Sequence, residues 1–293
     1  MKKALKLALA LTLVFALVFA AAGCGEKTPS ENQSPPPDVT AGDQTPDAAS
    51  GGKLDDIKNS GTLVVYTDPN FAPFEYIGDD EAIVGVDIAL AEEIAAELGA
   101  TVDVRSASFD SILMALKGGR GDVAISGFTI TEERRESVDF SIPYIDSVQY
   151  LILPEAAEVP ALEGLAGQTV GVAKGYTGQL LIEGELETGG ALDGQNVTVK
   201  AYNSAMEAVL DLNTGRLSAV IMDEYVAKTI ADNTAGVKAV ELCYADGTLA
   251  SEQYGVAVPK GNEALLEAVN AVIERLTAEG RIAEWVVDYS AVS

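Results

Sequence analysis

The sequence contains no histidine among its 293 residues. Imidazole is the general base of Ser-His-Asp and Cys-His catalysis and a principal ligand of catalytic zinc, so these chemistries are excluded. A metal site would have to be built from carboxylates alone. We therefore expect neither a bound metal nor a cofactor.

Cysteine is almost as scarce, since Cys24 and Cys243 are the two that are present, and they cannot form a disulfide framework. Cys24 follows a basic start over residues 1–6 and an apolar run over residues 7–22, the pattern of a secretory signal. The apolar run is short for a transmembrane span.

The residues before Cys24 are small and resemble the lipobox of bacterial lipoproteins, although Ala21 stands where leucine is usual. The resemblance implies a signal peptide over residues 1–23 and lipid attachment at Cys24. The alternative is a secretory signal cut after Ala22, with an incidental cysteine.

Basic residues are few, with 19 Lys and Arg against 45 Asp and Glu, and the formal net charge is −26. Nucleic acid and anionic membrane surfaces are therefore poor partners for the body of the protein. Residues 24–53 are acidic and proline-rich with almost no large apolar side chain, which predicts a disordered tether. Lipid, tether and globular part together predict a protein anchored at the outer face of the cytoplasmic membrane, extracellular or periplasmic.

From residue 54 the chain alternates predicted strands and helices, which indicates βαβ units, a parallel sheet and an α/β fold. After a break near residues 144–148 the pattern starts again. The predicted strands are 63–66, 101–105, 122–126, 169–172, 197–201 and 219–222, and the predicted helices are 86–98, 109–117, 178–187, 204–212, 224–231, 263–278 and 281–287.

A weak internal repeat relates residues 112–126 to residues 208–222, each a helix, a Gly-Arg turn and a buried strand. Ligands of open α/β sheets bind beyond the carboxyl ends of the strands. The first copy places residues 127–134 there, and the second places Asp223 there. Two lobes facing each other would then offer a carboxylate-binding site and a single carboxylate, which suits a zwitterion.

The turn over residues 126–134 has the form of an anion site, because a glycine turn before a helix leaves backbone N–H groups free. Thr131 is the predicted N-cap, and Arg134 adds a planar two-pronged donor. The plainer interpretation is an ordinary connection between a strand and a helix, with an arginine on the surface.

Six stretches resemble, in order and spacing, the polar amino-acid-binding proteins of ABC importers, bacterial solute-binding protein family 3. They are YTDPNFAPF (66–74), VGVDI (84–88), SGFTITEER (126–134), VDFSIPY (138–144), GVAKGYTG (171–178) and YGVAVPKG (254–261). The resemblance implies a two-lobed periplasmic-binding-protein fold (type II) with two hinge crossovers. Lobe 1 would comprise residues 54–147 plus 254–293, and lobe 2 residues 148–253.

The implied function is that of a monomeric receptor that closes its lobes around an amino acid and passes it to the ABC permease membrane subunits. The implied ligand is a polar or cationic L-amino acid, namely arginine, lysine, histidine, glutamine or cystine. Two other functions stay open on the same fold. One is a cyclohexadienyl-dehydratase-like enzyme, and the other is the amino-acid sensor subunit of a signalling system.

At the backbone end of the ligand, the resemblance implies that Arg134 clamps the α-carboxylate. Gly127 and Thr129 would assist it through backbone and hydroxyl groups. Thr177 and Gly178 would donate backbone N–H groups from lobe 2 to the same carboxylate.

At the other end of the ligand, Asp223 would bind the α-ammonium, and Phe71 and Phe109 would flank the side chain. Asp68 and Ala173 hold positions that contact the distal end of the ligand in relatives. An acidic distal pocket favours a cationic side chain.

Several of these residues also have a plain structural interpretation. Asp87, in the Gly-x-Asp element, approaches the same pocket or caps the helix that follows it, and Asp223 is a candidate N-cap. Phe71 and Phe109 could be ordinary core residues. Tyr176 stands where relatives usually carry a small hydroxyl residue, a departure from the family pattern.

Overall fold

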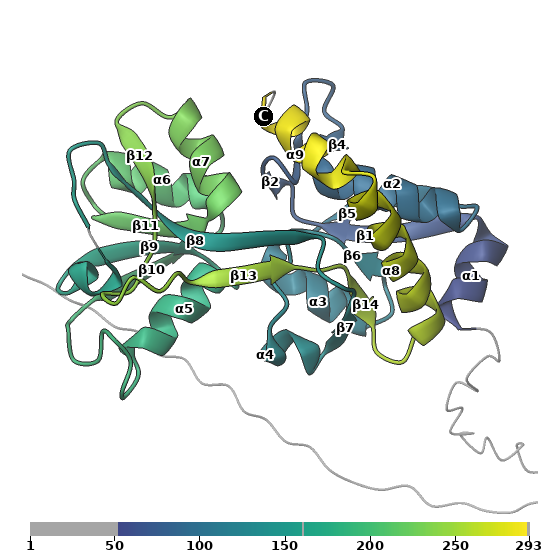
Figure 1. Cartoon of the computed structure of the whole chain (residues 1–293), viewed down its shortest axis with the longest axis horizontal. Helices are drawn as coiled ribbons and strands as arrows, with labels where there is room; N and C mark the ends of the chain where they lie inside the picture. Colours follow the sequence, from purple (N-terminus) through teal and green to yellow (C-terminus); the bar gives the residue numbers. More distant parts are fainter. Residues whose placement is uncertain (1–51, 160, 292–293) are drawn as a thin grey trace, which may run out of the picture. The chain divides into compact units, whose positions relative to one another are not determined.

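Two mixed β-sheets, each with helices packed against it, organise the residues that the structure describes, 52–159 and 161–291 (Figure 1). The structure is a computed structural model, and its described residues lie in one unit that spans residues 48–293. Cys24 and the predicted signal peptide and tether fall outside the described residues, except Gly52 and Lys53. Lys53 opens helix α1 and forms an ion pair of 2.9 Å with Asp122.

The first sheet has the strand order β5-β1-β6-β14-β7. Strand β1 runs parallel to β5 and β6, as the βαβ pattern predicts, whereas β14 runs antiparallel to both β6 and β7. A small sheet, β2-β3-β4, adjoins helix α2. The bounds are β1 Thr62–Thr67, β2 Asn70–Phe71, β3 Glu75–Ile77, β4 Ile83–Val84, β5 Thr101–Ser106, β6 Val123–Ala124, β7 Val138–Phe140 and β14 Ala257–Pro259.

The second sheet has the order β10-β9-β11-β8-β12. Strands β10, β9 and β11 are parallel, and β8 runs antiparallel to β11 and β12. The predicted parallel sheets are therefore mixed in both halves. The bounds are β8 Ile145–Pro154, β9 Thr169–Ala173, β10 Thr198–Tyr202, β11 Ala219–Asp223, β12 Val237–Glu241 and β13 Ser251–Tyr254.

Strands β8 and β13 form the two connections between the halves. The first residues of β8, 145–148, pair antiparallel with β13, and the later residues of β8 join the second sheet. Strand β13 leads after two residues into β14 of the first sheet. The chain thus crosses from one sheet to the other and back through a two-stranded ribbon (Figure 1).

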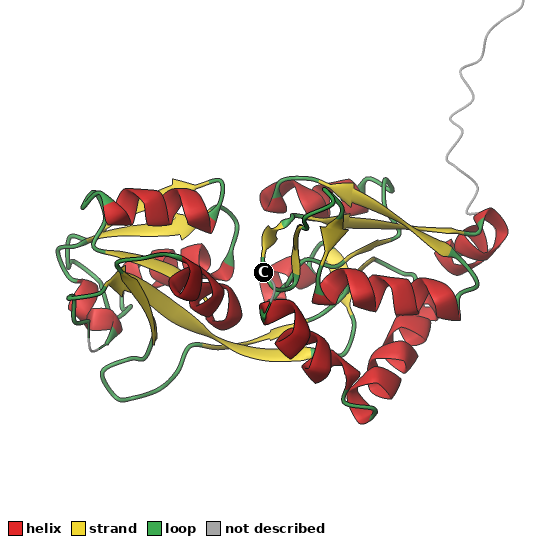
Figure 2. Ribbon diagram, turned by 90° about the horizontal axis from the view of Figure 1, so that it is seen from above, coloured by secondary structure: helices red, strands yellow, loops and turns green. Residues whose placement is uncertain are grey.

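Helices lie on both faces of the sheets (Figure 2). Helix α3 begins and ends at the predicted residues, and α8 begins and ends at the predicted residues as well. None of the helices among the described residues is both long and apolar enough to cross a membrane. The bounds are α1 Lys53–Ser60, α2 Val86–Glu97, α3 Phe109–Lys117, α4 Glu132–Arg135, α5 Thr177–Leu186, α6 Ala205–Asn213, α7 Glu224–Asn233, α8 Glu263–Ala278 and α9 Arg281–Ser290, with a 3₁₀ helix at Leu162–Leu165.

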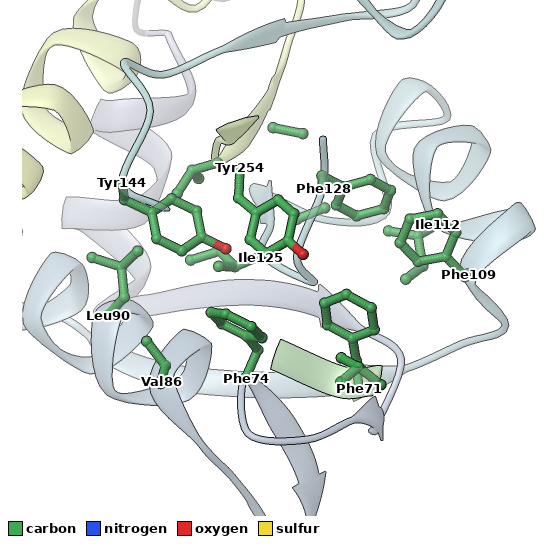
Figure 3. Close-up of a cluster of buried hydrophobic side chains, with 14 of the residues drawn as sticks. Phe71, Phe74, Val86, Leu90, Phe109, Ile112, Ile125, Phe128, Tyr144 and Tyr254 are labelled. Carbon is green, nitrogen blue, oxygen red and sulfur yellow. The ribbon is translucent and has the colours of Figure 1, made fainter. Parts of the chain in front are cut away.

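The core of the first half extends to the point where the two halves meet. Figure 3 shows an aromatic cluster there that includes Phe71, Phe74 and Tyr254. The ring centroids of Phe74 and Tyr254 are 5.3 Å apart, and those of Phe71 and Phe74 are 5.7 Å apart. This rigid base positions the residues considered next, because well-packed aromatic side chains have few alternative rotamers.

Candidate functional site

Arg134 is a buried cation at the meeting of the two halves, with 7% of its surface exposed. It follows the predicted N-cap, since Thr131 Oγ1 accepts a hydrogen bond of 3.2 Å from the Arg134 backbone N–H. Its guanidinium donates to the carbonyl of Thr129 at 2.7 Å and to the carbonyl of Gly175, in the second half, at 2.9 Å. Both acceptors are neutral, so the guanidinium is a strong candidate to bind a carboxylate.

The charges around Arg134 also favour a role in binding a carboxylate. Burial lowers the pKa of its guanidinium, and the nearby carboxylates of Asp223 and Glu252 oppose that shift. A buried cation is strongly stabilised by an opposite charge with good hydrogen-bond geometry. The plainer interpretation of Arg134 as a surface residue is therefore wrong.

Two backbone N–H groups of the glycine turn are already bonded to other parts of the chain. The Gly127 N–H donates to Asp87 Oδ2 at 2.8 Å, and the Ile130 N–H donates to the carbonyl of Gln253 at 2.8 Å. These N–H groups already have partners, and helix α4 is only four residues long. The charge that would attract an anion is thus on the Arg134 side chain.

Asp223 ends strand β11 and is 2% exposed. It occupies the N-cap position of α7, but its side chain makes no capping hydrogen bond. Instead, Oδ1 accepts from Gln149 Nε2 at 2.8 Å and Oδ2 accepts from the Tyr254 hydroxyl at 2.7 Å. Burial raises the pKa of Asp223, so its carboxylate is costly to keep ionised without a cation nearby.

Arg134 and Asp223 line one cavity of about 160 Å³. Most of its other lining residues are those that the sequence predicts, and the lining is completed by Phe71, Phe109, Gly127, Thr129, Tyr176 and Thr177. The two halves of the chain thus contribute side chains of opposite charge to the lining of the same space.

Tyr176 fills part of the space between the two predicted aromatic walls. Its ring centroid is 4.3 Å from that of Phe109 and 5.6 Å from that of Phe71. The side chain is 5% exposed and contacts both predicted aromatic walls. The departure from a small hydroxyl residue at this position thus reduces the space available between the walls.

The remaining predicted site residues do not line the cavity. Asp68 is buried and accepts from the Phe109 backbone N–H at 3.1 Å, at the start of α3. Ala173 is buried in strand β9, and Gly178 lies in the first turn of α5. All three support residues that do line the cavity, because each is adjacent to or bonded to one of them.

Asp87 is fully buried beneath the site and has a structural role. Its carboxylate accepts from the Gly127 N–H and, at 2.8 Å, from the Tyr144 hydroxyl. Burial raises the pKa of Asp87 to about 6, and its neighbour Glu75 is also buried. Asp87 therefore fixes the glycine turn from below and is separated from the cavity by that turn.

The sequence predictions missed Gln149 and Glu252. Glu252 lies on β13 with alternating burial, so that Glu252 and Tyr254 share the inward face. Its Oε2 accepts from Thr129 Oγ1 and Thr177 Oγ1, both at 2.8 Å, and its Oε1 accepts from Gln149 Nε2 at 2.9 Å. The sequence signal that could have identified Glu252 is the two-residue periodicity of a strand, which places Glu252 on the same face as Tyr254.

Comparisons with known proteins are consistent with this geometry. The sequence profile of the bacterial extracellular solute-binding proteins, family 3, matches residues 63–291. The L-cystine-binding protein TcyJ of Escherichia coli is 30% identical over 246 residues, which are 83% of this chain and 88% of TcyJ.

Solved structures give the same result. An amino acid ABC transporter substrate-binding protein from Streptococcus pneumoniae, bound to L-arginine, has a TM-score of 0.74 and 30% identity, covering 83% of this chain and 99% of that one. An ancestral arginine-binding protein bound to glutamine has a TM-score of 0.69 and 35% identity, and the match covers 78% of this chain and 97% of that one. These proteins have the two-lobed fold of periplasmic amino-acid-binding proteins.

Proposed function

Because the chain belongs to the bacterial extracellular solute-binding proteins, family 3, we propose that it is the receptor of an ABC importer for an amino acid. It binds the amino acid between its two lobes and delivers it to the permease subunits in the membrane. The relatives named above bind cystine, arginine or glutamine, so the family context supports a polar or cationic ligand.

One observation carries this proposal, namely that Arg134 and Asp223 line the same buried cavity from different halves of the chain. A zwitterion has to keep both of its charges paired when it leaves water, because each unpaired ion costs several kcal/mol. Arg134 binds the α-carboxylate and Asp223 binds the α-ammonium. Neither half alone satisfies both charges, so the ligand favours the closed arrangement of the lobes.

The charges around the cavity favour a cationic side chain within the set arginine, lysine, histidine, glutamine and cystine. Asp68 and Asp223 place two buried carboxyl groups near the cavity, against the one guanidinium of Arg134. The rings of Phe71 and Phe109 offer flat apolar walls, on which a guanidinium or ammonium group stacks favourably.

The protein is held at the outer face of the cytoplasmic membrane by lipid on Cys24. The proposal of lipid attachment rests on the sequence alone, in which an apolar run ends in small residues directly before Cys24. Lipid attachment keeps a receptor close to its permease when no outer membrane confines it.

A thermal-unfolding screen of the mature protein against the common L-amino acids and L-cystine tests the proposed function. A ligand that binds the folded state raises the melting temperature by mass action, by an amount that grows with its concentration. We expect at least one of arginine, lysine, histidine, glutamine and cystine to do so at micromolar to millimolar concentration. A screen without any stabilising amino acid, or turnover of prephenate or arogenate, would contradict the proposal.

A further inference from the structure

Glu252 joins the two lobes at the base of the cavity. Thr129, which follows β6 in the first half, and Thr177, which opens α5 in the second half, place their hydroxyl groups on the same Oε2 atom, each at 2.8 Å. The two hydroxyl oxygens are 3.4 Å apart. Both threonines also line the cavity between Arg134 and Asp223. The hydrogen-bonding state of Glu252 therefore affects two groups that face the ligand.

A threonine hydroxyl has one hydrogen to donate, and an ionised carboxylate can only accept. When Glu252 is ionised, both hydroxyl hydrogens point at Oε2, and the threonines present lone pairs to the cavity. When Glu252 carries a proton, its carboxyl group is neutral and can itself donate. At least one hydroxyl hydrogen is then free to turn toward a carboxylate beside Arg134.

The charged groups around Glu252 favour the protonated form. Asp223 shares Gln149 Nε2 with it, at 2.8 Å and 2.9 Å, so two carboxyl groups lie side by side. Arg134 and the Tyr254 hydroxyl also face it, and the hollows beside β13 are lined by Asp146, Glu224 and Tyr244. Burial, followed by the charge of Asp223, raises the pKa of Glu252 well above its usual value.

We propose that Glu252 is a positioning residue for the α-carboxylate of the ligand, taking up a proton when the ligand binds so that a hydroxyl group of Thr129 or Thr177 donates to the ligand. The proposal rests on the proposed function, because it requires an amino acid bound at Arg134. It also explains why an acidic residue lies next to a carboxylate-binding site, since a neutral Glu252 does not repel the ligand.

The consequence is that ligand binding is accompanied by the uptake of a proton at Glu252. The affinity is highest below the pKa of Glu252 in the free protein. Above that pKa it falls by about tenfold per pH unit, the slope expected for one linked proton. The substitution Glu252→Gln keeps the shape and a donor but cannot ionise, so it removes this dependence.

Isothermal titration with L-arginine as the probe tests the proposal between pH 5 and pH 8, at each pH in two buffers with different ionisation enthalpies. For the wild-type protein we expect weakening affinity toward pH 8 and an uptake of up to one proton. Glu252→Gln should bind at pH 8 at least as tightly as the wild type and show no uptake. Glu267→Gln is the matched control, because it makes the same change at an exposed glutamate of helix α8, and it should behave like the wild type.

Two outcomes would overturn the proposal. The first is wild-type affinity that is constant from pH 5 to pH 8 without proton uptake. This measurement needs no variant and stays decisive if Glu252→Gln does not fold. The second is a folded Glu252→Gln protein with the same pH profile as the wild type. If L-arginine, L-lysine, L-histidine, L-glutamine and L-cystine all fail to bind the wild-type protein at every pH, the proposed function is wrong, and this proposal falls with it.

Discussion

At the scale of single residues, the environment of Arg134 is the most informative feature. Its guanidinium is buried over the rings of Phe109 and Phe128, with centroid distances of 5.2 Å and 5.5 Å, and it donates to two backbone carbonyls. A ligand carboxylate would add an opposite charge and a two-pronged acceptor, neither of which a single neutral carbonyl provides. Exchange of a carbonyl partner for a ligand carboxylate is therefore favourable.

The first prediction concerns Tyr176, whose ring contacts both aromatic walls of the cavity. A ligand side chain has to compete for that space. Each aromatic pair contributes about 0.5–1.5 kcal/mol, so Tyr176→Ser should tighten the binding of arginine by about tenfold. Tyr176→Phe keeps the ring and should leave the affinity unchanged. Calorimetric titration measures both, and weaker binding by Tyr176→Ser would show that this ring holds the ligand rather than competing with it.

The second prediction concerns Asp87 and pH. Burial raises its pKa from 3.8 to about 6, so the folded state binds this proton more tightly than the unfolded state does. The resulting stability is fully present below about pH 4 and is lost as the pH rises through about 6. Asp87→Asn should reduce the fall in unfolding free energy between pH 4 and pH 7 by about 2 kcal/mol.

Urea unfolding at several pH values measures this difference. Glu97→Gln is the matched control, because it removes an exposed carboxylate from the same helix, α2. Equal pH dependence in Asp87→Asn and Glu97→Gln would show that the buried carboxyl group does not titrate in this range.

The sequence predicted the residues that carry the opposite charges and the aromatic walls, because strand ends and motif spacing determine where they lie. It did not predict the contacts of Asp68 and Asp87, since the same carboxylate can face a ligand or cap a turn. Glu252 was missed because its partners Thr129 and Thr177 are distant in the chain and meet only in the folded structure.

At the scale of elements, the turn between β6 and α4 depends on one glycine. Gly127 has a φ of 50°, and a Cβ atom there would collide with the Phe71 ring. Gly127→Ala should lower the free energy of unfolding by about 2–4 kcal/mol, from overpacking and the left-handed backbone together, and should weaken ligand binding.

Gly119→Ala is the control for this third prediction. Gly119 has a φ of 71°, but a Cβ atom there would meet open space. Gly119→Ala should lower the free energy of unfolding by about 1 kcal/mol and leave ligand binding unchanged. Chemical unfolding and calorimetry measure both effects, and equal losses of stability in the two variants would show that the packing against Phe71 is unimportant.

Helices were easier to predict than sheet order. Helix α3 was predicted because its apolar spacing and the following glycines are local signals. The family resemblance placed residues 254–293 in lobe 1, but it did not show that β14 pairs with β6 and β7, which lie more than a hundred residues earlier. Because β14 runs antiparallel to β6 and β7, the first sheet is mixed, and no local sequence pattern encodes this pairing.

At the scale of the whole molecule, two halves with separate sheets share one site and are joined by the ribbon of β8 and β13. Gln149 lies on β8 and Glu252 on β13, and both bond to residues that line the cavity. The connections between the lobes therefore contribute to the site itself. This arrangement suits a receptor in which lobe closure and ligand contact occur together.

The fourth prediction concerns attachment to the membrane. Cys24→Ser removes the proposed site of lipid attachment and leaves the globular part unchanged. We expect the variant to move from the membrane fraction to the soluble extracytoplasmic fraction, with unchanged affinity for its ligand. Cys243→Ser should stay in the membrane fraction, and cell fractionation with immunoblotting distinguishes the two. Retention of Cys24→Ser at the membrane would contradict lipid anchoring at this residue.

The central claim is that Arg134 binds the α-carboxylate of an amino acid, and a cycle of two proteins and two ligands tests it most directly. Calorimetry compares L-arginine with agmatine, which lacks that carboxylate, on the wild-type protein and on Arg134→Ala. Arg135→Ala, with an exposed arginine removed from the same helix, is the control. We predict that wild type and Arg135→Ala prefer L-arginine by at least about thirtyfold, the effect of losing about 2 kcal/mol from a buried charge pair. Arg134→Ala should bind both ligands with similar, weak affinity, and a preference for L-arginine that survives in Arg134→Ala would contradict the account.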